Sequence, residues 1–142
     1  MADDVETTLR TLLRSGPFHA FLNMELVGHD AEAGTVEIRL PWRREFERAV
    51  DTRQWHGGPI AALVDIAGDF ALVARLGRGI PTIDLRIDYL RPAIDTDLVA
   101  RGRTLRAGRS IGAVDVEVRD ARDRIVAVGR GTYSTLAPER GA

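Results

Sequence analysis

Two carboxylates and two glycines are the residues of this chain whose types and spacing could do chemistry. Asp65 and Asp69 stand four residues apart in an otherwise apolar stretch that follows Gly57-Gly58 and ends near Gly77. On a helix this spacing places both acids on one side, roughly 5–6 Å apart at Cβ. A buried carboxylate costs free energy unless it is paired or hydrogen-bonded. The two acids therefore need a partner or a task.

Several tasks suit each carboxylate. Asp65 could act as a general base for water or as a nucleophile that forms an acyl-enzyme anhydride. It could equally be an aspartate that pairs with one of the 20 basic residues, all of which are arginine. Asp69 could position water, share a proton with Asp65, or meet an arginine across an interface. The sequence alone leaves these alternatives open.

The glycines precede the same apolar stretch, where a helix would begin. The first amides of a helix have no internal acceptor, and the helix dipole places partial positive charge there. Gly57 and Gly58 would let a ligand approach the backbone closely, so the site could polarise a carbonyl and stabilise an oxyanion. The alternative is a tight turn into the helix. His56 could act as a general acid, donate a hydrogen bond to substrate, or be structural.

Other kinds of site find little support. The chain has no cysteine, and its net charge of −1 comes with basic residues spread without interleaved aromatics, which argues against a nucleic-acid partner. No set of His and carboxylate residues has metal-ligand spacing, and no phosphate loop or Gly-x-Ser-x-Gly elbow is present. No apolar run reaches the roughly 20 residues of a membrane span. The acidic N-terminus is unlike a signal peptide, so we expect a cytoplasmic protein. From the ligand spacing we expect no metal.

The periodicity of apolar residues predicts two helices and six strands. A short amphipathic helix is expected first and a long buried helix, with Pro59 at its first position, in the middle. A charged connection of helical or irregular character precedes the long helix. The expected helices cover residues 3–14 and 59–76, the connection 43–54, and the strands residues 23–30, 35–40, 83–89, 97–105, 114–118 and 125–133.

This order of elements predicts an α+β fold with an antiparallel sheet, formed by one domain over residues 1–142. Each strand has one apolar face, and the long helix is available to cover it. A sheet curled around that helix satisfies both elements. The sheet would have edges that need protection, and pairing an edge strand across a two-fold axis is one solution. We therefore expect a homo-oligomer.

The ordered set of motifs resembles the hotdog-fold acyl-CoA thioesterases, and most of all their PaaI-like (phenylacetate-pathway, 4-hydroxybenzoyl-CoA thioesterase) branch. The resemblance covers roughly residues 17–135. It implies a hotdog fold, in which a sheet of about six strands wraps around one central helix, here with a short N-terminal helix added. It also implies a homodimer or a dimer of dimers. The motifs are Pro17-Phe18, His56-Gly57-Gly58 with Asp65, residues 84–93, Gly108-Arg109-Ser110 and residues 125–132.

The resemblance also implies catalytic roles. The Gly57 amide would polarise the thioester carbonyl, with Gly58 supporting it. Asp65, reaching in from the partner subunit's helix, would be the base or nucleophile. Thr82 matches the position of a Ser or Thr that orients water, and Asp69 the position of a threonine near that water in another branch.

Substrate contacts follow from the same resemblance. Arg91 and the pair Arg109-Ser110 lie in loops that often meet the phosphates of coenzyme A. The implied reaction is hydrolysis of an aryl- or medium-chain acyl-CoA to a free acid and coenzyme A. No cofactor is implied, since coenzyme A enters only as part of the substrate. The alternatives are a hotdog dehydratase or hydratase, and a non-catalytic acyl-CoA-binding protein.

The chain departs from the family pattern before the His-Gly-Gly motif. Many members keep an Asn or Gln about six residues earlier, in contact with the water or the thioester. Val50 stands at that spacing here, and Gln54 or Asp51 could take its place if the loop is shifted. An uncompensated loss of this polar group would lower the catalytic rate and favours the binding-protein alternative.

Overall fold

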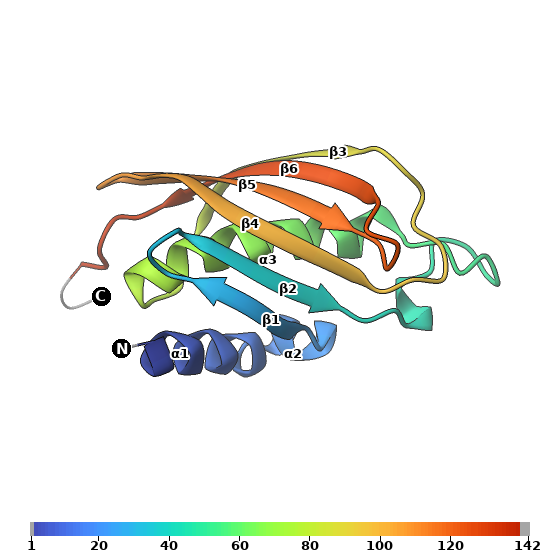
Figure 1. Ribbon diagram of the computed structural model, residues 1–142, viewed down its shortest axis with the longest axis horizontal. Coiled ribbons are helices and arrows are strands. Elements are labelled where there is room, and N and C mark those ends of the chain that lie inside the picture. The colour runs from blue at the N-terminus through green and yellow to red at the C-terminus, as the bar shows by residue number, and fades with distance from the viewer. Residues whose placement is uncertain (1, 140–142) are drawn as a thin grey trace.

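A long helix lies against one face of a six-stranded sheet in the computed structural model, which describes residues 2–139 (Figure 1). Two shorter helices, α1 and α2, precede the first strand. The elements are α1 (Ala2–Ser15), α2 (Pro17–Leu22), β1 (Glu25–Asp30), β2 (Thr35–Leu40), the 3-10 helix η1 (Arg44–Phe46), α3 (Gly57–Leu76), β3 (Thr82–Tyr89), β4 (Leu98–Ala107), β5 (Ile111–Arg119) and β6 (Ile125–Ser134). No helix within residues 2–139 is both long and apolar enough to cross a membrane.

The sheet confirms the predicted hotdog fold. Its strand order is β1-β2-β4-β5-β6-β3, and every neighbouring pair is antiparallel. The sheet curves over α3, which packs against strands from both ends of it (Figure 1). Alternation along β2 follows the sequence pattern, since Val36, Ile38 and Leu40 are fully buried beneath the sheet. The apolar faces of the strands and the apolar helix thus cover each other.

Helix α3 is longer than expected and begins earlier. It covers Gly57–Leu76 and ends at Gly77, whose left-handed conformation (φ 71°) suits a helix C-terminus. The prediction that Pro59 takes the first helical position is wrong, because Pro59 is the third residue of the helix. The His56 side chain caps the helix at Gly58, so the helix starts two residues before the proline. Proline is tolerated there because amides of the first turn have no acceptor within the helix.

The N-terminal segment holds a second helix that the sequence pattern did not indicate. Residues 17–22 form α2 instead of leading directly into the first strand. Pro17 occupies its first position, and Asn23 ends it in the left-handed conformation (φ 55°). The first strand consequently begins at Glu25, not near residue 23. Leu9 and Leu13 of α1 belong to the hydrophobic core.

Strand β3 forms one edge of the sheet. It pairs only with β6, and its other edge has no partner within the part of the chain that the structure describes. Apolar side chains at both ends of it are exposed, with Ile83 at 57% and Tyr89 at 53% of their full area. A free strand edge with exposed apolar side chains favours pairing with another chain. This edge is important for the site, because β3 also carries Thr82.

Candidate functional site

The N-terminus of α3 presents one free backbone donor. His56 Nδ1 accepts a hydrogen bond from the Gly58 N–H at 2.8 Å, so Gly58 is occupied by the helix cap. Within residues 2–139 the Gly57 N–H has no acceptor. Tyr89 from the end of β3 donates its hydroxyl to the Gly57 carbonyl at 2.8 Å and so fixes this turn. Of the two predicted glycines, only Gly57 can therefore offer its N–H to a ligand.

His56 has a structural task in this arrangement. Because Nδ1 accepts the Gly58 N–H, a neutral His56 ring carries its proton on Nε2. The His56 N–H donates to the Phe46 carbonyl at 2.7 Å, which ties the start of α3 to η1. The imidazole is exposed, so Nε2 could still meet a ligand.

A cavity of about 520 Å³ opens beside Gly57. It contains two arginines, Arg48 and Arg91, and neither forms an ion pair or a side-chain hydrogen bond with any residue of the described range. Guanidinium groups beside a helix N-terminus are chemically suited to an anion. Arg91 was predicted here and Arg48 was not. The lining residues are Arg48, Gln54, Trp55, His56, Gly57, Ile60, Tyr89, Leu90, Arg91, Pro92 and Ala93.

The loop before α3 shows how the chain deals with its missing Asn or Gln. Val50 is 80% exposed and does not line the cavity. Asp51 accepts a hydrogen bond from Arg44 at 3.4 Å. Gln54 does line the cavity. Of the two substitutes considered from the sequence, Gln54 is the one whose side chain lies where a ligand could meet it.

A second group of polar side chains lies at the middle of α3. Thr82, the first residue of β3, donates its hydroxyl to Asp65 Oδ1 at 2.7 Å. The fully buried Tyr133 of β6 donates its hydroxyl to the Asp65 carbonyl at 2.8 Å. The structure therefore brings Asp65 and Thr82 of one chain together. Tyr133 was missed, because an aromatic on the apolar face of the last strand looks like an ordinary core residue.

Two glycines make room for Tyr133. A Cβ at Gly68 of α3 or at Gly131 of β6 would clash with the tyrosine hydroxyl. Helix and strand can therefore approach closely, and the hydroxyl reaches the backbone of α3 between Asp65 and Asp69. Burial first, and then the two carboxylates, raise the pKa of Tyr133 above its ordinary value. The hydroxyl consequently stays protonated and remains a donor.

The carboxyl group of Asp69, near Tyr133, has a strongly raised pKa. Burial, followed by the charge of Asp65 one turn earlier, raises the pKa of Asp69 from 3.8 to about 7, against the opposing backbone N–H of Ile80. Asp69 Oδ1 is buried without a hydrogen-bond partner in the described chain. At neutral pH a substantial fraction of this side chain is therefore an uncharged carboxylic acid.

The free amide and the carboxylates are well separated within one chain. Gly57 and Asp65 are eight residues apart on a continuous helix, which corresponds to roughly 12 Å along its axis. Neither Asp65 nor Thr82 lines the cavity beside Gly57. Within one chain the Gly57 N–H and the Asp65 carboxylate are thus too far apart to contact the same carbonyl group.

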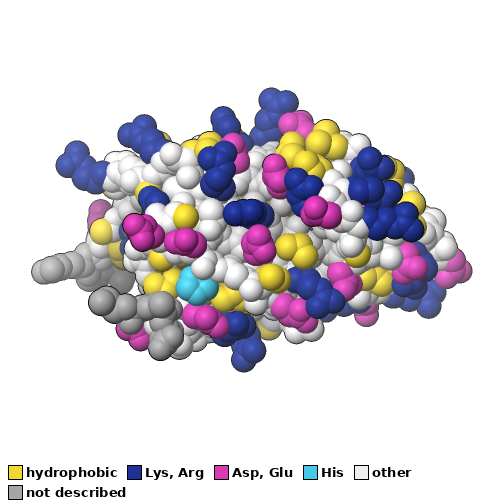
Figure 2. Space-filling model, viewed as in Figure 1, with side chains coloured by type: hydrophobic (Ala, Val, Ile, Leu, Met, Phe, Trp, Pro, Cys, Tyr) yellow, Lys and Arg dark blue, Asp and Glu magenta, His cyan; other side chains and the backbone are white. Residues whose placement is uncertain are grey.

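The third predicted element lies elsewhere. Arg109 and Ser110 are exposed in the turn between β4 and β5, close to the C-terminal half of α3 and at the opposite end of the sheet from Gly57 (Figure 1). A cluster of arginine side chains also lies at the right-hand end of the molecule (Figure 2), the end of the β2–α3 loop and of the start of α3 in Figure 1. Neither Arg109 nor Ser110 lines the cavity beside Gly57, so their predicted contact with coenzyme A stays a prediction.

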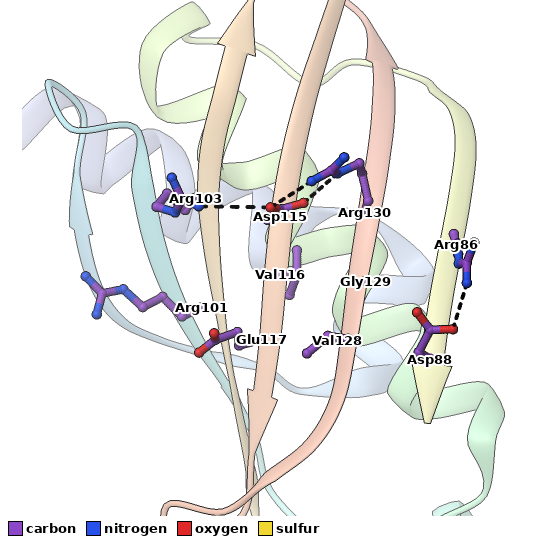
Figure 3. A pocket seen from close by; sticks show the side chains of 10 residues that line it. All are labelled: Arg86, Asp88, Arg101, Arg103, Asp115, Val116, Glu117, Val128, Gly129 and Arg130. Atoms are coloured by element: carbon purple, nitrogen blue, oxygen red, sulfur yellow. Dashed lines mark hydrogen bonds and ion pairs between the residues drawn. The ribbon is translucent and has the colours of Figure 1, made fainter. Parts of the chain in front are cut away.

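A second cavity, of about 720 Å³, lies away from all predicted site residues, on the outer face of the sheet (Figure 3). Its charged side chains largely neutralise one another. Arg130 binds Asp115 through two hydrogen bonds of 2.7 and 3.0 Å, and Arg86 lies 3.4 Å from Asp88. We therefore place the candidate site at α3. Within residues 2–139 no group of three or more His, Asp or Glu side chains could hold a metal ion.

Comparison with known proteins identifies the family. The profile of the Thioesterase superfamily matches residues 54–127. A Halobacterium salinarum protein provisionally named an esterase is 31% identical over 143 residues, which cover 93% of both chains. The medium/long-chain acyl-CoA thioesterase YigI of Escherichia coli K12 is 28% identical over 138 residues, which cover 82% of this chain and 84% of YigI.

Solved structures agree with this assignment. A protein of the thioesterase superfamily superposes with a TM-score of 0.85 at 32% identity and covers 93% of this chain and 98% of its own. The Escherichia coli PaaI protein of the phenylacetic acid degradation operon has a TM-score of 0.84 at 19% identity, and 96% of each chain is covered. At that identity PaaI shows the fold alone, and it is the fold the sequence predicted.

Proposed function

Because the chain belongs to the Thioesterase superfamily, we propose that it hydrolyses an acyl-CoA thioester to a free acid and coenzyme A. The observation that carries this proposal is the Gly57 N–H, which has no acceptor within residues 2–139, beside a cavity lined by two arginines without an ion pair in that range. The amide suits the thioester oxygen, and the arginines suit the phosphates of coenzyme A. The relative named an acyl-CoA thioesterase supports the same substrate class.

Gly57 supplies the electrophilic part of the mechanism. Its N–H donates to the thioester carbonyl oxygen and stabilises the negative charge that forms there when water attacks. Because the Gly58 N–H is held by His56, the oxyanion receives one backbone donor from this turn. Tyr89 keeps the turn in place through the Gly57 carbonyl.

Asp65 supplies the basic part, and it comes from a second copy. The separation of roughly 12 Å along α3 prevents one chain from placing Gly57 and Asp65 on the same carbonyl. A homodimer that pairs the free edges of β3 across a two-fold axis would set the two α3 helices antiparallel. Gly57 of one copy would then face Asp65 and Thr82 of the other. Dimers could pair further into a dimer of dimers.

The reaction then proceeds in two steps. Asp65 accepts a proton from water as the water oxygen bonds to the carbonyl carbon and the carbonyl electron pair moves onto oxygen. The oxyanion collapses, the carbon–sulfur bond breaks, and the coenzyme A thiolate leaves with the bonding electrons. The proton held by Asp65 returns to the products. Thr82 orients the carboxylate by its hydrogen bond to Oδ1, and a nucleophilic role of Asp65 would use the same geometry.

The acyl group is proposed to be an aryl or medium-chain one. Apolar side chains share the cavity with the arginines, among them Ile60, Tyr89 and Leu90. An aryl or alkyl group of moderate size can pack against these, and the name of the YigI relative indicates medium or long chains for that protein.

The test is release of free thiol from a panel of aryl- and fatty-acyl-CoA esters by wild type and Asp65→Asn. We expect turnover by the wild type and a loss of about 10²-fold or more in the variant. Tight binding of a CoA ester without turnover by the wild type would favour an acyl-CoA-binding protein, as the exposed Val50 allows. Turnover that survives in Asp65→Asn would contradict the mechanism.

A further inference from the structure

Asp69 has no place in the mechanism above, although it lies one turn from the proposed base. Its Oδ1 atom is buried and has no hydrogen-bond partner among the described residues. No arginine of residues 4–139 forms an ion pair with Asp65 or Asp69. A buried acceptor without a donor is costly, whereas a protonated carboxyl group is itself a donor.

Three groups act on Asp69, from α3 itself, from β6 and from the α3–β3 connection. They are Asp65 on its own helix, the Tyr133 hydroxyl from β6 and the Ile80 N–H from the α3–β3 connection. The Tyr133 hydroxyl is engaged with the Asp65 carbonyl, and Thr82 is engaged with Asp65 Oδ1. None of these groups carries a positive charge. Two carboxylates side by side would therefore repel each other without a compensating cation.

Resting on the proposed thioester hydrolysis, we propose that Asp69 is a positioning residue that works as a neutral acid. Its carboxyl proton is donated towards the Asp65 carboxylate or the water that Asp65 activates. The site then holds one negative charge while an oxyanion forms nearby. When Asp69 loses its proton, the hydrogen bond is lost and a second negative charge opposes the oxyanion. Deprotonation of Asp69 thus switches the site off.

The decisive experiment compares the pH dependence of kcat in wild type, Asp69→Asn and Glu32→Gln. Asn keeps the shape of the side chain and an NH₂ donor but cannot ionise. We expect kcat of the wild type to fall at least about tenfold between pH 7 and 9, with a midpoint near the pKa of about 7. The fall should be absent in Asp69→Asn. Glu32, exposed on the β1–β2 hairpin, is the matched carboxylate-to-amide control and should keep the wild-type profile.

Stability gives a readout that needs no turnover. An acid whose pKa is raised from 3.8 to about 7 by folding binds more protons in the folded than in the unfolded state between these values. Its contribution is fully present below pH 3.8 and is lost as pH rises through 7. The melting temperature of wild type minus that of Asp69→Asn should therefore fall by several degrees from pH 4 to pH 8. A difference that does not change with pH would overturn the proposal.

Direct titration covers the case in which Asp69→Asn does not fold. In wild-type protein with ¹³C-carboxyl-labelled aspartate, one carboxyl resonance should stay upfield after the others have moved downfield on deprotonation. Its own shift should have a midpoint near pH 7. If every aspartate titrates near 4, for example because an arginine of a second copy pairs with Asp69, the proposal is wrong. A folded Asp69→Asn variant with the wild-type pH profile, or without activity at any pH, would also contradict it. Absence of turnover in the wild type would count against the proposed function, while the titration would still decide the state of Asp69.

Discussion

The two parts of α3 that carry polar groups differ in almost every physical respect. The N-terminal end is open and lies beside a cavity, where neither the Gly57 N–H nor the side chains of Arg48 and Arg91 have a partner among the described residues. The middle is partly buried and acidic, and Asp65 is held by Thr82 and by the buried Tyr133. One end attracts negative charge and the other supplies it. A reaction in which a base drives the formation of an oxyanion needs both, and this is why we propose that each α3 helix of a homodimer contributes to two sites.

The largest effect should follow from removing the single donor at the open end. Gly57→Pro deletes the N–H, yet proline suits the first helical position and His56 already has the extended backbone (φ −67°, ψ 146°) that precedes proline. We expect kcat for thioester hydrolysis to fall about 10²–10³-fold. Gly57→Ala is the matched control, because it adds a Cβ but keeps the N–H. Equal activity of the two variants would mean that the Gly57 amide is not the oxyanion donor.

The same variant tests whether the two regions come from different copies. Gly57→Pro and Asp65→Asn are each expected to be nearly inactive alone. When they are co-expressed with different tags, about half of the dimers should be mixed, and each mixed dimer should regain one intact site. Purified mixtures should therefore recover about one quarter of the wild-type rate. Mixed dimers without recovered activity would show that the two residues do not meet across the interface.

Glycine-to-alanine changes should lower the free energy of unfolding more at the middle of α3 than at its N-terminal end. Gly68→Ala places a Cβ against the Tyr133 hydroxyl, which is fully buried and cannot move away. We expect a loss of about 1–3 kcal/mol in the free energy of unfolding by urea at a fixed protein concentration. Gly57→Ala meets the Tyr89 hydroxyl at 3.3 Å, and the half-exposed Tyr89 can shift. Similar losses in both variants would contradict the difference in packing.

The sequence predicts those features that depend on residues close together in the chain, and misses those that depend on distant ones. The buried helix and strand β2 were predictable because their apolar periodicity is local. The Asp65–Asp69 pair was also local, since both residues lie on one helical face. Helix α2 was missed because six residues hold too little periodicity. The task of Tyr133 depends on Gly68 and Gly131 meeting across about 60 residues of chain, and no local pattern marks it.

The cavity beside Gly57 shows the same limit. Arg48 and Gln54 enter it through a loop whose course is fixed by contacts with distant residues, among them a bridge between Gln54 and Ile94. The sequence could only offer Gln54 and Asp51 as substitutes at a shifted position. The structure distinguishes them, because Gln54 lines the cavity and Asp51 is bonded to Arg44.

The arginines of the open end should act on substrate binding. Arg48→Ser and Arg91→Ser are each expected to raise KM for an acyl-CoA about tenfold with little change in kcat, because each removes one charge-assisted contact to a phosphate. The corresponding acyl-pantetheine thioester lacks the nucleotide phosphates and should be insensitive. Arg14→Ser on α1, far from the cavity lining, is the control. A rise in KM for both substrates would show that these arginines bind the acyl part instead.

The smallest effect is expected at His56, whose side chain caps α3 next to the proposed oxyanion donor Gly57. If its task is to accept the Gly58 N–H, His56→Ala should cost about 1 kcal/mol of stability, and His56→Asn, which can cap, should cost little. Activity should follow the same order, because the cap fixes the direction of the neighbouring Gly57 N–H. A general acid, by contrast, would be lost equally in both variants, and kcat would fall together in each. Urea unfolding and thiol release, measured on both variants, therefore decide whether the open end contributes a side chain to the chemistry or only a backbone.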